Sequence, residues 1–310
     1  MKLVFCGTPL FAVPTLERLA AAGHELQLVV TQPDRPQGRG MELTAPPVKQ
    51  SALKLSLPII QPEKIKKNEE FKAQLTALQP DAIIVVGYGR IIPTWMLALP
   101  RFGNINVHAS LLPKYRGAAP IQWAIAEGET VSGVTTMHLN EGLDTGDILL
   151  QKQLPIQPED TSLTYAPPLA ELGADLLVET LRGLETKTIT PIPQNHSQAT
   201  LAPILKKEDG LIDFNRTVTQ IHNRLRGFQP WPGAYTHFRG KNLKFISAKP
   251  DDTPSNLAPG ELRIGDEKLF VGCGQRSVLQ LLQVQPEGKK ALTAREFING
   301  YHPAAGERLG

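Results

Sequence analysis

The chain has 310 residues, of which 41% are hydrophobic and 20% are charged, with a formal net charge of +3 and a mean hydropathy of −0.17. This composition is that of a globular protein of one or two domains, and no apolar run approaches the ~18 residues of a membrane helix, so we expect no membrane partner. The opening MKLVFCGTP reads as a strand entering a turn, not as a signal peptide, and the two cysteines, Cys6 and Cys273, lack CxxC spacing. We therefore expect a cytoplasmic protein without a disulfide framework.

Strand-like and helix-like segments alternate over the first half of the chain. Because the strand-like runs are apolar on both faces, the alternation indicates a Rossmann-like open parallel α/β sheet in residues 1–185. Paired prolines at Pro167 and Pro168 place the start of the last helix near Pro168, since proline is tolerated only in a first turn. The expected strands span 2–7, 25–31, 57–61, 81–89, 104–110, 133–139 and 147–153, and the expected helices span 12–23, 68–79 and 169–184.

The amino-acid composition changes after that helix. Residues 186–204 are rich in Thr, Pro, Gln and Ser, which predicts a linker between two domains. Short β-like runs separated by Gly and Pro follow, and they predict a small β-barrel, similar to an OB-fold, in residues 205–310. Earlier in the chain, residues 31–47 form a long strand-to-helix connection, and loops of more than about 12–15 residues are usually functional.

Two polar residues interrupt the apolar run at 104–110. Asn106 and His108 are two positions apart, so on a strand they point to the same side, near the carboxyl end where open α/β sheets bind ligands. Downstream, Asp144 stands between Gly142 and Gly146, in a segment whose glycines allow a tight loop. A carboxylate near His108 would favour the imidazolium and orient the ring. The alternatives are a satisfied core histidine and a carboxylate that only shapes a turn.

Basic residues concentrate in the C-terminal part. Residues 205–310 contain 16 Lys and Arg against 11 Asp and Glu, and residues 214–250 contain seven basic residues and no acidic one. Such asymmetry suggests a polyanionic partner, because basic residues neutralise phosphates and exposed aromatic rings stack on unpaired bases. The aromatic residues interleaved with this run are also candidates for the core of the small domain; they are Phe228, Trp231, Tyr235, Phe238 and Phe245.

Several motifs together resemble those of the methionyl-tRNA formyltransferases. These motifs are FCGTPLFAVPTLERL at the start, TQPDRPQGRG, VVGYGRIIP, NINVHASLLPKYRGAAPIQ, GLDTGDIL and, near the C-terminus, GFQPWPGAYT, so the resemblance covers nearly the whole chain. The Asn-x-His-x-Ser-Leu-Leu-Pro core with a downstream Asp is shared by formyltransferases that use 10-formyltetrahydrofolate. The resemblance therefore implies transfer of a formyl group from that folate to the amino group of methionine on initiator tRNA.

The resemblance also assigns roles to residues of this chain. It implies that Asn106, His108 and Asp144 are catalytic, without a metal. Asn106 would donate to the tetrahedral oxyanion, a contact typically worth ~3–4 kcal/mol, while His108, oriented by Asp144, would stabilise the same charge or handle a proton. The implied folate-binding residues are Ser110, Leu111, Leu112 and Pro113, and the implied tRNA-binding residue is Arg39. The basic C-terminal part adds Lys206, Lys207, Arg224 and Arg226 as candidate tRNA-binding residues.

Some features depart from the family pattern or leave room for other functions. Asn140 stands where relatives often have aspartate, and the proline pair falls where the family begins a more polar helix. One alternative is a formyltransferase that acts on an amino-sugar nucleotide, which shares the catalytic core. Another, from a different class, is a non-catalytic RNA-binding protein on the same fold. We expect a monomer.

Overall fold

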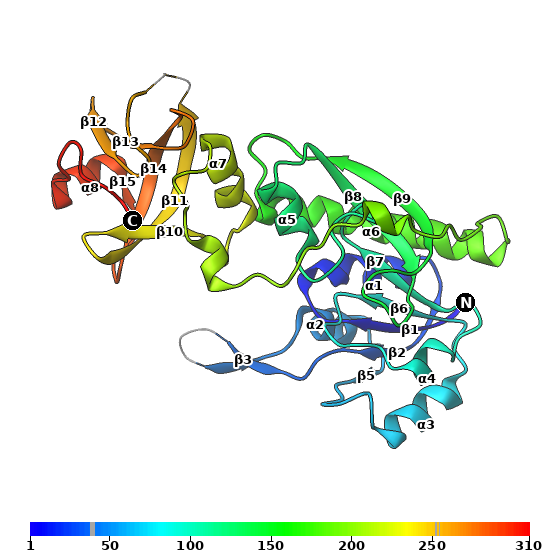
Figure 1. The fold of residues 1–310 in the computed structure, drawn as a ribbon. Coiled ribbons are helices and arrows are strands. Elements are labelled where there is room, and N and C mark those ends of the chain that lie inside the picture. Colours follow the sequence, from blue (N-terminus) through cyan, green and yellow to red (C-terminus); the bar gives the residue numbers. More distant parts are fainter. Residues whose placement is uncertain (38–40, 252, 254) are drawn as a thin grey trace. The chain divides into compact units, whose positions relative to one another are not determined.

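The computed structural model describes residues 1–37, 41–251, 253 and 255–310 (Figure 1). The chain divides into two compact units. The first comprises Met1–Ala118, Val131–Pro155 and Ala166–Ala202, and the second comprises Ala119–Thr130, Ile156–Tyr165 and Pro203–Gly310. Each unit is thus made of three separate segments of the chain. The sequence analysis expected two continuous domains, 1–185 and 205–310, joined by a linker, and these limits stay a prediction.

A seven-stranded sheet forms the centre of the first unit. Its order is β5-β2-β1-β6-β7-β8-β9, and β8 runs antiparallel to both neighbours while the other pairs are parallel. The expected open parallel α/β sheet is confirmed, and β8 is its one antiparallel strand. The strands are β1 (Lys2–Gly7), β2 (Glu25–Val30), β5 (Ile59–Ile60), β6 (Ala82–Val86), β7 (Asn104–His108), β8 (Val131–His138) and β9 (Ile148–Pro155).

Connection length explains the antiparallel strand. Only residues 139–147 join β8 to β9, and they form no helix, whereas a parallel crossover needs a dozen or more residues. The connection from β7 to β8 does contain a helix, α5 (Pro120–Ala126), but that helix groups with the second unit. It therefore does not act as a crossover helix on this sheet.

Helices cover both faces of the first sheet. On one face, Phe71 and Leu75 of α3 (Glu69–Leu78) and Met96 of α4 (Thr94–Leu97) join a cluster that includes Cys6 and Ile83 of the strands. On the other face, α6 (Ser162–Glu185) packs closely enough that a Cβ on Gly173 would lie 2.9 Å from Val107 of β7. The remaining elements are η1 (Leu10–Ala12), α1 (Val13–Ala21), β3 (Arg35–Gln37), β4 (Glu42–Thr44), α2 (Pro47–Lys54) and η2 (His196–Gln198).

The helix α6 begins at Ser162, which contradicts the expected start near Pro168. Thr161 and Thr164 exchange hydrogen bonds between the backbone N–H of each and the Oγ1 of the other, at 2.9 and 3.3 Å, and thereby cap the first turn. Tyr165 in that turn is only 1% exposed. Capping and burial outweigh the unfavourable term of ~3 kcal/mol that an interior proline imposes, so Pro167 and Pro168 stand inside the helix.

An antiparallel sheet forms the centre of the second unit. Its order is β10-β11-β14-β13-β12, with β15 paired to β14. The C-terminal segment links the two edge strands, because Leu262 of β12 donates to the Glu307 carbonyl at 2.8 Å and Gly310 donates to the His237 carbonyl of β10 at 3.0 Å. The elements are η3 (Lys207–Gly210), α7 (Val218–Gly227), β10 (Ala234–Phe238), β11 (Lys241–Asp251), β12 (Leu262–Gly265), β13 (Lys268–Gly272), β14 (Val278–Pro286), β15 (Leu292–Thr293) and α8 (Ala294–Tyr301).

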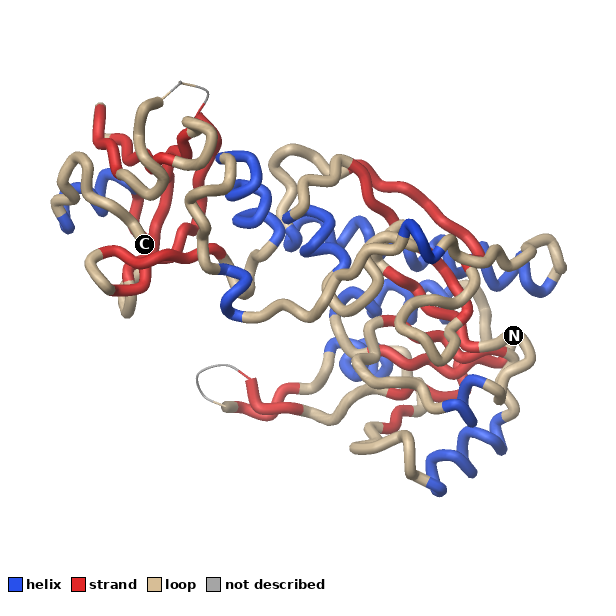
Figure 2. Tube along the Cα trace, viewed as in Figure 1, coloured by secondary structure: helices blue, strands red, loops and turns tan. Residues whose placement is uncertain are grey.

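Figure 2 separates the strands, helices and loops of both units and shows that the connection 31–47 contains the short hairpin of β3 and β4. Both cysteines are buried and free, and burial raises the pKa of the Cys273 thiol to about 12. Within the described ranges, no helix is both long enough and apolar enough to cross a membrane.

Candidate active site

Strand β7 carries the first two site residues. Val107 packs toward α6, so its neighbours Asn106 and His108 point to the opposite face of the sheet, beside Met137 and Thr135 of β8. Asn106 is 9% exposed and His108 is 6% exposed. Among the residues that the structure describes, the side-chain amide of Asn106 has no hydrogen-bond partner, so its N–H groups are available to a ligand.

The loop between β8 and β9 brings Asp144 to His108. Leu139 donates to the Asn104 carbonyl at 2.8 Å, so the loop starts beside the amino end of β7 and runs back along the strand. Asp144 itself has φ of 51°, a left-handed conformation that aspartate tolerates better than most residues. Gly146 is required here because a Cβ at this position would overlap the His138 carbonyl oxygen.

Asn140 shapes the same loop. Its Oδ1 accepts hydrogen bonds from the Gly142 N–H at 3.0 Å and from the Thr145 hydroxyl at 2.8 Å. Asn140 therefore supplies the acceptor oxygen that holds the turn without placing a negative charge there.

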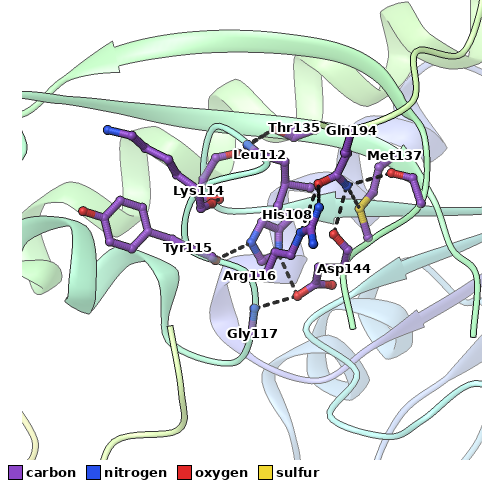
Figure 3. Close-up of polar contacts among 12 residues, drawn as sticks. His108, Leu112, Lys114, Tyr115, Arg116, Gly117, Thr135, Met137, Asp144 and Gln194 are labelled. Carbon is purple, nitrogen blue, oxygen red and sulfur yellow. Dashed lines mark hydrogen bonds and ion pairs between the residues drawn. The ribbon is translucent and has the colours of Figure 1, made fainter. Parts of the chain in front are cut away.

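His108 and Asp144 face each other across a short gap (Figure 3). The distance from His108 Nδ1 to Asp144 Oδ2 is 3.7 Å, while His108 Nε2 lies 2.9 Å from the Tyr115 carbonyl oxygen. Asp144 Oδ2 also accepts from the Gly117 N–H at 2.8 Å. Gly117 has φ of +121°, and a Cβ there would lie 2.6 Å from the Ala202 carbonyl oxygen, so only glycine places its N–H in this position.

The 110–113 loop follows β7 and is anchored to the sheet. Thr135 Oγ1 donates to the Ser110 carbonyl at 2.7 Å and accepts from the Leu112 N–H at 3.1 Å. Gln151 Nε2 donates to the Leu112 carbonyl at 2.9 Å. Ser110 and Leu112 are buried, whereas Leu111 and Pro113 are partly exposed. The backbone N–H and carbonyl of Leu112 are therefore hydrogen-bonded within the protein, and within residues 110–113 the partly exposed positions are Leu111 and Pro113.

Sequence reasoning missed two residues of the site, Arg116 and Gln194. They are 7% and 6% exposed, and both Nε and Nη2 of Arg116 donate to Gln194 Oε1, at 3.1 and 2.6 Å. The side-chain amide of Gln194 in turn donates to the carbonyls of Asp144 and Gly146. Arg116 stands in the RGAAPIQ motif, which was a usable signal, but Gln194 lies in the polar segment that was expected to be a linker.

The basic residues expected to bind tRNA fall into different environments. Lys206 and Lys207 are exposed, while Arg39 lies outside the described residues. Arg224 is half-buried, with its guanidinium 3.4 Å from Glu127 and over the ring of Trp123. Burial, followed by the charge of Arg216, lowers the pKa of Arg224 below its ordinary value.

Arg226 is more deeply buried than the other basic residues expected to bind tRNA that the structure describes. Its side chain is 7% exposed, and its guanidinium donates to the Asp160 carbonyl at 2.6 Å and to Asn223 Oδ1 at 2.7 Å. Burial lowers its pKa from the ordinary value. This burial and these partners favour a structural role for Arg226 over a phosphate contact. The tRNA-binding assignment stays a prediction.

Metal binding finds no support in side-chain clusters. In the part of the chain that the structure describes, no group of three or more His, Cys, Asp or Glu residues is arranged to hold a metal ion.

Comparison with known proteins extends this description. The formyl transferase family model matches residues 1–181, and the model of the formyl transferase C-terminal domain matches residues 204–302. A solved N-formyltransferase from Helicobacter canadensis, in complex with folinic acid and dTDP-3-aminofucose, has a TM-score of 0.68 at 19% identity over 92% of this chain and 99% of that one. A methionyl-tRNA formyltransferase structure from Clostridium thermocellum has a TM-score of 0.55 at 18% identity, covering 80% of this chain and 93% of that one. The fold and both domains thus define a formyltransferase.

The curated relatives narrow the class. The methionyl-tRNA formyltransferase of Koribacter versatilis is 66% identical over 310 residues, which is 100% of this chain and 99% of the relative. That of Acidobacterium capsulatum is 59% identical over 100% of both chains. The chain belongs to the methionyl-tRNA formyltransferase family and is an enzyme of that activity.

Proposed function

We propose that this enzyme transfers the formyl group of 10-formyltetrahydrofolate to methionine on initiator tRNA, with Asn106, His108 and Asp144 as its catalytic residues. The observation that supports the proposal is the buried His108, which faces Asp144 and lies on the same face of the sheet as Asn106, whose side-chain amide has no partner among the described residues. In the reaction, a bond forms between the methionine nitrogen and the formyl carbon, and the bond from that carbon to folate N10 breaks. The proton lost by the amine ends on N10.

His108 handles that proton. A carbonyl oxygen only accepts hydrogen bonds, so the contact with the Tyr115 carbonyl assigns a hydrogen to Nε2 and leaves Nδ1 as the nitrogen whose protonation changes. Asp144 Oδ2 is 3.7 Å from Nδ1, too far for a direct hydrogen bond but close enough to stabilise an imidazolium. Nδ1 therefore accepts the proton of the attacking amine and delivers it to the leaving nitrogen.

Asn106 stabilises the charge that develops on the formyl oxygen. Its N–H groups have no internal partner among the described residues, so donation to an oxyanion breaks no existing hydrogen bond. A preorganised donor of this kind typically contributes ~3–4 kcal/mol to the transition state.

The folate-binding region is proposed at the carboxyl edge of the sheet. Strands β1, β6 and β7 are adjacent and parallel, so the loops that follow them lie along one edge. Two of these loops expose Leu10, at 69%, and Ile91, at 89%, and the third presents the partly exposed Leu111. These apolar side chains fit a pterin ring. We propose Leu111 and Pro113 as its contacts, with Ser110 and Leu112 holding their loop.

The tRNA contacts are proposed in the second unit. Lys206 and Lys207 are exposed and can neutralise phosphates. Of the aromatic residues in the basic run, Phe228, Phe238 and Phe245 are buried, but Trp231 is 54% exposed and is available to stack on a base. Arg224 is proposed as a weaker phosphate contact, because its guanidinium is already paired with Glu127. The role of Arg39 in tRNA binding stays an expectation.

An acceptor assay tests the proposal. The purified chain receives 10-formyltetrahydrofolate with initiator methionyl-tRNA, elongator methionyl-tRNA or an amino-sugar nucleotide, and release of tetrahydrofolate is followed. We expect transfer to initiator methionyl-tRNA that weakens steeply as salt rises, since phosphate contacts dominate such binding. Comparable transfer to the amino-sugar nucleotide, or equal rates with both tRNAs, would contradict it.

A further inference from the structure

Residues 194–202, which the sequence marks as part of a linker, contact both sides of the catalytic pair. We call them the positioning segment. At one end, Gln194 contacts the Asp144 loop (Figure 3). At the other end, Thr200 contacts the backbone that follows the 110–113 loop. The segment therefore lies within the first unit's site and does not only connect two domains.

The side-chain amide of Gln194 has one possible orientation. Its Nε2 lies 2.9 Å from the Asp144 carbonyl oxygen and 2.7 Å from the Gly146 carbonyl oxygen, both of which only accept. Its Oε1 faces the guanidinium of Arg116, which only donates. Because donors and acceptors are fixed on both sides, neither a carboxylate nor a flipped amide satisfies this position.

Arg116 is an unusual anchor for such an amide. It is 7% exposed, and its guanidinium contacts Gln194 Oε1 at 2.6 Å and His196 Nδ1 at 3.1 Å. Throughout the described residues, it forms no ion pair with a carboxylate. A buried guanidinium that fixes a glutamine, which in turn fixes a catalytic loop, indicates a role in placing that loop.

The same segment holds the partner of His108. The Tyr115 N–H donates to Thr200 Oγ1 at 2.9 Å, the Arg116 N–H donates to the Thr200 carbonyl at 2.9 Å, and the Ala202 N–H donates to the Arg116 carbonyl at 2.7 Å. These bonds fix the Tyr115 carbonyl, which accepts from His108 Nε2. Both members of the catalytic pair are therefore set by one stretch of chain.

We propose that Gln194 and Arg116 are positioning residues that set the separation between His108 and Asp144. The proposal rests on the proposed roles of that pair. Misplacing Asp144 by about 1 Å would lower turnover about 10- to 100-fold without changing how either substrate binds. The effect is expected in kcat and not in KM, because neither residue is assigned to a substrate contact.

The variant Gln194→Glu tests this directly. It keeps an acceptor for Arg116 and replaces the donor to the Asp144 loop with an oxygen that repels two carbonyls. Gln198→Glu is the matched control, since Gln198 is exposed in the same segment and makes no side-chain hydrogen bond among the described residues. We expect kcat for formyl transfer to fall about 10- to 100-fold in Gln194→Glu, with both KM values within about twofold, and to stay unchanged in Gln198→Glu.

A double-mutant cycle separates positioning from general destabilisation. In an Asp144→Asn background, Gln194→Glu is expected to add less than about twofold, because residues that act through one group are not additive. Full multiplication of the two effects, or a normal kcat in Gln194→Glu, would overturn the proposal. If Gln194→Glu does not fold, Arg116→Lys replaces it, with a smaller loss in kcat and the same non-additivity expected. Failure of the proposed function is distinguishable, since Asp144→Asn alone would then be fully active.

Discussion

Strand β7 and helix α7 each carry two polar side chains two positions apart, and the two pairs behave differently. On β7, Asn106 and His108 share one face and meet at the site. On α7, Arg224 is half-buried beside Glu127, while Arg226 is buried and bonded to the Asp160 carbonyl. Residues i and i+2 project to the same side of a strand but to different sides of a helix. Residue spacing therefore predicts a shared site only when the type of element is known.

The largest expected effect tests the strand pair. His108→Ala removes the group that accepts and returns the proton, so we expect kcat for formyl transfer to fall about 10²- to 10⁴-fold while folate binding persists. Single-turnover kinetics with initiator methionyl-tRNA provide the measurement. The control is His237→Ala in β10 of the second unit, which is expected to stay within about twofold of the unmodified enzyme. Near-normal turnover in His108→Ala would remove the basis of the catalytic assignment.

An intermediate effect tests the buried member of the helix pair. Arg226→Ala leaves the Asp160 carbonyl and the Asn223 amide oxygen without their donor. Both groups are partly buried, so we expect a loss near the lower end of the about 1–3 kcal/mol that a fully buried unsatisfied group costs. We expect a lower melting temperature for the second unit and an unchanged KM for tRNA at a temperature where the variant is folded. A raised KM at normal stability would show instead that Arg226 contacts RNA.

The smallest effect tests the exposed basic residues. The exposed Lys206 side chain makes no hydrogen bond or ion pair with another described residue, so stability is expected to stay the same in Lys206→Ala. We expect KM for tRNA to rise severalfold. The slope of log KM against log salt concentration is expected to fall by about 1, which corresponds to the loss of one phosphate contact. Lys206→Ala and Arg226→Ala are best measured together. We expect Lys206→Ala to raise KM at unchanged stability and Arg226→Ala to lower stability at unchanged KM. An unchanged salt slope would speak against Lys206 as a phosphate contact.

Much of the fold follows from local patterns. Apolar runs predicted β1, β2, β6 and β7 within a few residues, because a buried parallel strand needs apolar side chains on both faces. The direction of β8 and the start of α6 were missed. The first depends on where the chain re-enters the sheet, and the second depends on capping by Thr161 and on the burial of Tyr165, which compete with proline.

The sequence by itself determined the parallel α/β sheet, the β-rich second part and the placement of Asn106 and His108 on one face of a strand, because strand periodicity is a local property. Only the tertiary structure decided that Asp144 reaches His108 from the far end of β7, that Gln194 holds its loop, and that Arg226 is buried. These placements join residues tens of positions apart through hydrogen bonds and burial. Such contacts depend on the fold of the whole chain, so the residues next to Gln194 or Arg226 in the sequence do not predict them.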